Sequence, residues 1–138
     1  MSINPTFLTF EEVLELHQTQ IALYGGTMGI RDMGLLESAV NAPAAKFGGA
    51  FLHEDWASMA AALLFSVVKN HPFLDGNKRT AGMAMFTFLQ LNGLEPVASE
   101  TDYYATMMAV ASGQMSKEEL AVWVQTIVRG APPDVTTE

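Results

Sequence analysis

Apolar residues in the first part of the chain recur with the spacing of a helix. Across residues 10–24 they return every three or four positions, so a helix would gather them on one face. Thr9 and Glu12 form a T-x-x-E capping box, in which each side chain satisfies a backbone N–H that the helix leaves free. Gly25 and Gly26 supply a stop. The pattern therefore predicts a first helix that ends at about Tyr24.

Similar signals divide the rest of the chain into five further helices. Asp32 and Asp55 stand where caps are expected, and Ser116 opens a second capping box, S-x-x-E. Proline closes the second helix and disfavours helical backbone just after the third. The predicted helices run over residues 33–41, from 56 to about 70, 78–91, from about 101 to 112, and from 117 to about 129.

The fourth of these helices is apolar on nearly every side over residues 81–91, which is typical of a buried central helix. Residues 43–54 show no clear period and predict a loop with a short extended piece around 47–52. Residues 130–138 are polar and carry two prolines, so we expect a frayed tail. No internal repeat is visible. The prediction is one all-α domain over residues 1–138, with its core at about 8–128 and about six helices around a buried central one.

Composition narrows the class of function. With 138 residues, of which 49% are hydrophobic, the chain can bury a core, and a wholly disordered protein is excluded. Seven basic against fifteen acidic residues give a net charge of −8. Direct DNA binding is therefore not expected, because phosphate neutralisation needs a basic surface.

The same composition bears on metal chemistry and location. Without cysteine there is neither a disulfide framework nor a thiolate metal site, and the three histidines are too scattered for a metal centre. His17 lies on the apolar face of the first helix and is expected to be a hydrogen-bonded core residue, whereas His53 is expected to be an exposed loop residue. No secretion signal is visible, and no apolar run reaches the roughly 18 residues of a membrane span. The expectation is a cytoplasmic protein without membrane association.

Chemistry concentrates in residues 71–80, HPFLDGNKRT, between two buried helices. The start of a helix has free backbone N–H groups and the positive end of the helix dipole, which together favour an anion. Lys78 and Arg79 place positive charge at the positive end of this dipole, which is unfavourable unless an anion lies between them. Phosphate is the anion that fits best. Arg79 could bind two of its oxygens at once through its guanidinium, and Lys78 could act as a point charge.

The neighbouring residues complete a set for phosphoryl or nucleotidyl transfer. His71 can accept a proton from a hydroxyl, and Asp75 is a natural Mg²⁺ ligand beside substrate phosphates. Gly76 lets the backbone approach a ligand closely. The string is not a Walker A loop, because its spaced glycine and Gly-Lys-[Ser/Thr] ending are missing.

The string HPFLDGNKRTA closely resembles the signature of the Fic/Doc family, H-P-F-x-[D/E]-G-N-G-R-x-x-R. Lys78 stands where the AMP-transferring members carry glycine, and Gly82 stands where they carry a second arginine. Both departures are those of the Doc (death-on-curing) branch, whose pattern ends N-K-R-T. Residues 16–40, LHQTQIALYGGTMGIRDMGLLESAV, also resemble the Doc N-terminal region.

The resemblance implies a six-helix Fic-type fold and a toxin of a toxin–antitoxin pair. Such a toxin would transfer the γ-phosphate of ATP to a hydroxyl of elongation factor Tu and halt translation, with Mg²⁺ as cofactor. Lys78 and the missing second arginine would reverse the orientation of the nucleotide. The implied catalytic residues are His71, Asp75 and Arg79, with Asp75 also the metal ligand, and the implied nucleotide-binding residues are Lys69, Gly76, Asn77, Lys78 and Arg79.

Three points stay open at this stage. The inhibitory [S/T]-x-x-x-E-[G/N] helix of Fic proteins is absent, so restraint is expected from an antitoxin whose disordered segment folds on the toxin. Residues 43–54 are either a plain connector or the flap that aligns the target. Transfer of AMP, or an inactive relative that binds a nucleotide or a partner, are the alternative functions.

Overall fold

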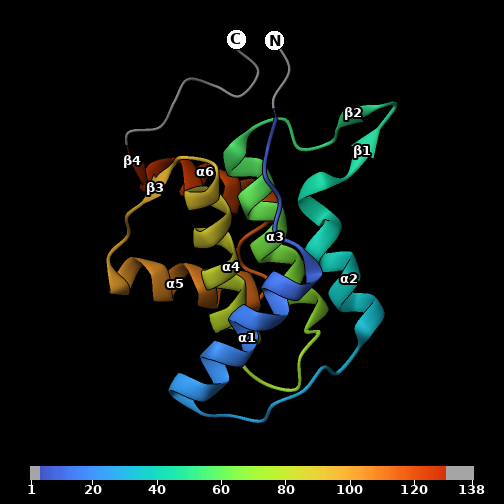
Figure 1. The fold of residues 1–138 in the computed structure, drawn as a ribbon. Coiled ribbons are helices and arrows are strands. Elements are labelled where there is room, and N and C mark those ends of the chain that lie inside the picture. The colour runs from blue at the N-terminus through green and yellow to red at the C-terminus, as the bar shows by residue number, and fades with distance from the viewer. Residues whose placement is uncertain (1–3, 130–138) are drawn as a thin grey trace.

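Six α-helices make up most of the protein in its computed structural model, which describes residues 4–129 (Figure 1). This confirms the all-α prediction. The predicted tail, residues 130–138, lies outside the described residues. The helices are α1 (Phe10–Tyr24), α2 (Met33–Asn41), α3 (Trp56–Asn70), α4 (Asn77–Leu91), α5 (Glu100–Ala111) and α6 (Lys117–Ile127).

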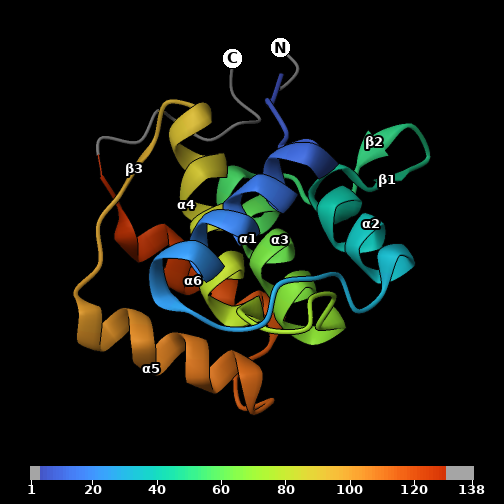
Figure 2. The same cartoon turned by 60° about the horizontal axis from the view of Figure 1, so that its bottom comes forward.

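The core is built around the pair α3 and α4. α3 packs against α2, α4 and α6, while α1 packs on α4 (Figure 2). Small residues on α3, including a run of three alanines at 60–62 that is almost fully buried, let these helices approach closely. α4 buries one long face, but Met83 and Leu91 are exposed, so the prediction of a helix buried on nearly every side is wrong there. α3 shares the central position.

Local capping chemistry defines most helix starts. The capping boxes at Thr9 and Ser116 form as predicted, and Asp32 and Asp55 each accept a backbone N–H of the helix that follows. Two starts differ: α4 begins one residue earlier, at Asn77, and Ser99 caps α5 by accepting from the Asp102 N–H. That helix therefore begins at Glu100 instead of after Thr101.

Two short antiparallel pairs complete the fold. β1 (Lys46–Phe47) and β2 (Ala50–Phe51) form a hairpin after the short 3-10 helix η1 (Ala42–Ala44), which gives the predicted extended piece its structure. The glycines between the strands have φ of 61° and 84°, as a tight turn of this hand requires. β3 (Glu95–Pro96) pairs with β4 (Val128–Arg129), so α6 ends at Ile127 and not at Arg129. Among the helices of residues 4–129, none is long and apolar enough to cross a membrane.

Candidate functional site

The loop between α3 and α4 places His71 at the surface. α3 ends where Pro72 disfavours helical backbone at the residue before it. His71 takes the left-handed conformation at φ 50°, and it is the one non-glycine residue between positions 4 and 129 with a positive φ. Phe73 is fully buried and anchors the loop in the core. His71 therefore stands on an anchored loop, in a backbone conformation that L-residues adopt rarely.

Asn77 holds this loop together from inside. Its amide oxygen accepts the Phe73 N–H at 2.9 Å, and its amide nitrogen donates to the Phe73 carbonyl at 3.0 Å. The side chain is buried. The family resemblance implied nucleotide binding for Asn77, but each polar group of its side chain already makes a hydrogen bond within the loop. Its backbone N–H lies in the first turn of α4, where N–H groups have no partner within the helix.

A pocket of about 180 Å³ lies over the loop and the first turn of α4. It brings together most of the residues that the sequence singled out. Its lining residues are His71, Leu74, Asp75, Gly76, Asn77, Lys78 and Arg79.

The carboxylate of Asp75 is held open to solvent by backbone hydrogen bonds. It accepts the Thr27 N–H at 3.1 Å and the Gly76 N–H at 2.8 Å. These two bonds, from Thr27 first and then Gly76, hold the pKa of Asp75 below its usual value, and the nearby Arg79 lowers it further. A Cβ at Gly26 would lie 2.7 Å from the nearer carboxylate oxygen and would force it to shift, and the φ of 119° at this position also favours glycine. Asp75 is therefore ionised at neutral pH.

This carboxylate suits Mg²⁺ bound together with phosphate. Each oxygen takes one N–H and keeps a free lone pair for a cation. Within the part of the chain that the structure describes, no group of three or more ligating side chains could hold a metal ion by itself. Mg²⁺ commonly binds through one or two carboxylates, with substrate phosphates and water as the other ligands. Asp75 fits that arrangement.

The start of α4 has the features of an anion-binding site. Its N-cap, Gly76, is in the left-handed region at φ 75° and brings no side chain to cap the first N–H groups. These N–H groups, with the positive end of the helix dipole, attract negative charge. Lys78 is exposed and adds a formal charge at the pocket.

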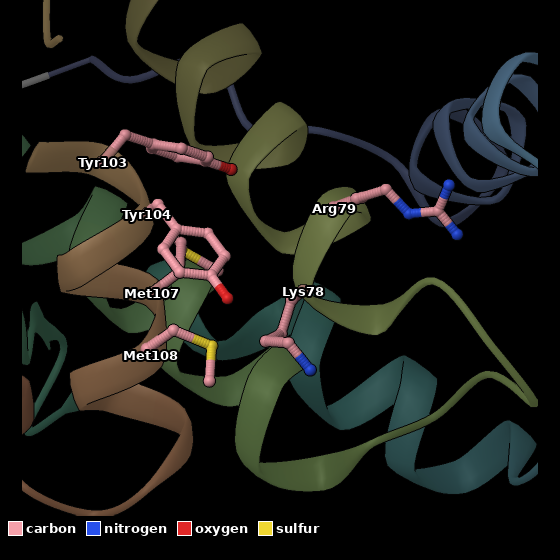
Figure 3. Close-up of a pocket in the computed structure, with 6 residues that line it drawn as sticks. All are labelled: Lys78, Arg79, Tyr103, Tyr104, Met107 and Met108. Atoms are coloured by element: carbon pink, nitrogen blue, oxygen red, sulfur yellow. The ribbon is translucent and has the colours of Figure 1, made fainter. Parts of the chain in front are cut away.

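Arg79 is partly committed to α1. Its Nη2 donates to the Gly25 carbonyl at 3.1 Å, and its guanidinium lies 5.7 Å from the centre of the Tyr24 ring. Figure 3 shows Arg79 extending toward α1 while Lys78 points elsewhere. Both side chains line the pocket, and they extend in different directions (Figure 3).

Lys69 is not among the residues that line this pocket. Its ammonium lies 5.6 Å from the centre of the Phe65 ring, on its own helix. A Cβ at Gly113, after α5, would lie 3.8 Å from it. The structure therefore does not bring Lys69 to the pocket, in contrast to the other predicted site residues.

Two residues that support the loop come from distant parts of the chain. His17 of α1 is buried, stacks on the Phe73 ring at 3.7 Å and donates from Nε2 to the Asp75 carbonyl at 2.8 Å. This confirms the predicted hydrogen-bonded core histidine. Arg31, which precedes α2, donates to the carbonyls of Asn70 and His71.

The histidines predict a dependence of stability on pH. Burial lowers the pKa of His17 below 6.5 despite its bond to the Asp75 carbonyl, and burial likewise lowers that of His53. His53 is half-buried, so its predicted exposure is wrong, because its loop packs near the start of α6. A lowered pKa means that the unfolded chain binds more protons between that pKa and 6.5. These two histidines therefore cost no stability well above pH 6.5, and they destabilise the folded protein increasingly as the pH drops below it.

Thermal unfolding between pH 7.5 and about pH 5 checks this expectation. The midpoint of the wild-type protein should fall toward acid pH. His17→Gln lowers stability at every pH, since it removes the stack on Phe73, but its midpoint should depend less on pH. His53→Gln serves as the second variant. Equal slopes in all three proteins would contradict the assignment.

Gly82 is needed for close packing of α4 on α5. A Cβ at this position would overlap the hydroxyl of Tyr103 and lie 2.7 Å from Cζ. Burial raises the pKa of that phenol. The structure therefore explains a glycine in this helix by close helix contact. A larger side chain at position 82 has no room.

Tyr103 also separates two mainly apolar pockets beside the loop. One, of about 140 Å³, is drawn in Figure 3 and is lined by Lys78, Arg79, Tyr103, Tyr104, Met107 and Met108. The other, of about 230 Å³, is lined by Gln20, Tyr24, Arg79, Met83, Phe86 and Tyr103. Met83, which lies in the stretch 81–91 predicted to be buried, is exposed here, and so is Met108. Arg79 connects these pockets with the one over the loop.

Comparisons with known proteins agree on one family. A family model described as "Fic/DOC family" matches residues 7–89, which span α1 to the greater part of α4. "Toxin Doc" of Mycolicibacterium smegmatis is 45% identical over 75 residues, which are 54% of this chain and 58% of that relative. "Protein kinase doc" of Escherichia phage P1 is 30% identical over 111 residues, or 80% of this chain and 86% of that relative. The matched family region contains the whole loop of residues 71–79.

Proposed function

We propose that this chain, which belongs to the Fic/DOC family, is the toxin of a toxin–antitoxin pair and transfers the γ-phosphate of ATP to a protein hydroxyl. We further propose elongation factor Tu as the target, which places the reaction in the cytoplasm and halts translation. One observation carries the proposal: an exposed histidine, an ionised carboxylate and two cations surround a single pocket at an uncapped helix start. The relatives' names, one a toxin and one a protein kinase, agree with it.

The triphosphate binds at the start of α4. Backbone N–H groups of the first turn, with Gly76 as the N-cap, receive phosphate oxygens. Lys78 supplies a point charge, and Arg79 supplies a guanidinium that its bond to Gly25 holds toward one side of the pocket. Asp75 would hold Mg²⁺, which would neutralise negative charge that develops on the phosphates during transfer.

His71 acts as the general base. Its neutral imidazole accepts the proton of the target hydroxyl while the hydroxyl oxygen attacks the γ-phosphorus. The bond from that phosphorus to the oxygen bridging the β- and γ-phosphates breaks, and ADP leaves with this oxygen. The products are ADP, the phosphorylated target and a protonated His71, which returns its proton to solvent.

The packing of Gly82 favours phosphate transfer over AMP transfer. AMP-transferring members carry a second arginine at this position, and here the Tyr103 hydroxyl occupies the space of even a Cβ. Lys78 in place of glycine adds bulk and charge at the anion site. Both features support an orientation of ATP in which the γ-phosphate faces His71.

The antitoxin partner fits the apolar surface beside the loop. Tyr24, Met83, Tyr104 and Met108 are exposed there, and they line the two pockets that meet at Arg79. We propose that an amphipathic antitoxin segment folds on this surface with an acidic side chain toward Lys78 and Arg79. Binding there would restrain the enzyme by covering the cations of the phosphate site.

ATP labelled at one phosphate tests the reaction directly. Purified elongation factor Tu is incubated with this protein, Mg²⁺ and ATP carrying the label on either the γ- or the α-phosphate. Label should reach the target from γ-labelled ATP alone. Transfer from α-labelled ATP would show AMP transfer and overturn the proposal, and transfer from neither would overturn the activity on this target.

A further inference from the structure

A strap of residues 29–32 runs antiparallel to the loop that carries His71. The N–H groups of Arg31 and the residue after it donate to the Pro72 carbonyl at 2.7 and 3.1 Å. Leu74 donates back to the first residue of the strap at 3.0 Å. An isolated bridge between Ile30 and the loop joins the same two segments. The backbone of the loop is therefore held by the backbone of the strap.

The side chain of Arg31 makes a second and separate connection. Its Nε donates to the His71 carbonyl at 2.6 Å, and its Nη2 donates to the Asn70 carbonyl at 2.8 Å. These carbonyls lie at the end of α3, where no intrahelical donor reaches them and the helix dipole is negative. A planar guanidinium with several donors suits two consecutive carbonyls, as a single ammonium does not.

These two hydrogen bonds constrain the peptide groups on both sides of the His71 Cα. The Asn70 carbonyl belongs to the peptide group that precedes this atom, and the His71 carbonyl belongs to the one that follows. Orienting both groups sets φ and ψ of His71, here 50° and 55°. The same two angles set the direction of the Cα–Cβ bond and hence of the imidazole. Left-handed backbone is uncommon for a residue other than glycine, and such conformations persist where the surroundings hold them.

We propose that Arg31 is a positioning residue for the transfer reaction, because its guanidinium holds the left-handed turn that aims His71 at the attacking hydroxyl. This inference rests on the proposed role of His71 as the base. Arg31 is exposed and does not line the phosphate pocket. Its loss leaves the backbone bonds of the strap in place, so the effect falls on the rate of transfer and not on the fold or on ATP binding.

Arg31→Gln and Arg31→Lys test the proposal, with Lys117→Gln as a control that removes one positive charge at the start of α6. For Arg31→Gln, kcat should fall by about 10- to 100-fold, since small misplacements of a catalytic group carry such costs. The KM for ATP and the midpoint of thermal unfolding should stay close to wild type. The kcat of Arg31→Lys should lie between those of the wild-type protein and Arg31→Gln, and the kcat of Lys117→Gln should equal that of the wild type. A wild-type kcat in Arg31→Gln would overturn the proposal.

A double variant separates positioning from a general structural effect. If Arg31 acts through His71, then His71→Ala with Arg31→Gln is no slower than His71→Ala alone. Independent, additive losses would contradict a role through His71. This comparison uses the residual rate, which single-turnover measurements give.

NMR of the imidazole ring distinguishes failure of this inference from failure of the proposed function. If the wild-type protein transfers no phosphate, the function is wrong, but the orientation of His71 can still be observed without ATP. Arg31→Gln should shift or broaden the His71 ring signals and leave those of buried His17 unchanged. Unchanged His71 signals would overturn the positioning role, whatever the activity.

Discussion

His71→Ala is expected to lower the single-turnover rate of phosphate transfer by about 10²- to 10⁴-fold, the usual contribution of a general base. The side chain is exposed and lines the phosphate pocket. Its removal takes nothing from the core, because Phe73 and Asn77 anchor the loop from inside. The midpoint of thermal unfolding and the affinity for ATP should therefore stay close to those of the wild-type protein.

The matched variant is His71→Asn, because asparagine tolerates the left-handed backbone of this position better than alanine and is no base at neutral pH. It should be as inactive as His71→Ala. A wild-type single-turnover rate in either variant would contradict the assignment of His71 as the base. If a variant loses both its activity and its folded state, the loss of activity is a packing effect. Circular dichroism shows whether each variant is folded.

Asp75→Ala is expected to remove the Mg²⁺ dependence of ATP binding. In the wild-type protein, Mg²⁺ should strengthen ATP binding by on the order of tenfold, because the ionised carboxylate and the phosphates share the cation. The lowered pKa of Asp75 keeps this carboxylate charged at neutral and mildly acidic pH. Titration calorimetry with and without Mg²⁺ measures the difference for each protein.

Asp75→Asn is the control for loop structure. Its amide oxygen can still accept one of the two backbone N–H groups, from Thr27 or Gly76, that the carboxylate accepts. It should keep more of the loop geometry than alanine and still lose the Mg²⁺ dependence. Equal ATP affinity with and without Mg²⁺ in the wild-type protein would defeat the metal assignment.

The helices and the site loop could be predicted because their signals are local. A capping box such as Thr9 with Glu12 spans four residues, and the same short range defines the starts at Asp32 and Asp55. The chemistry of the site is likewise contiguous, from His71 to Arg79, so one segment of sequence displays it.

The supports of the site could not be predicted, because they join residues far apart in the chain. The bond from His17 to Asp75 spans 58 positions, and that from Arg31 to His71 spans 40. Nothing near Arg31 in the sequence shows that its donors meet the end of α3. The contact of Gly82 with Tyr103 depends in the same way on how α5 crosses α4. Met83 was predicted to be buried because it is apolar. It is exposed because it lies on the open surface between α1 and α5.

Intact-mass analysis of elongation factor Tu, after incubation with this protein, ATP and Mg²⁺, tests the central claim most directly. We expect a mass increase equal to a single phosphate group, and no increase when His71→Ala replaces the wild-type protein. A mass increase equal to AMP would contradict the proposed orientation of ATP. An unchanged mass with the active, folded protein would contradict elongation factor Tu as the target.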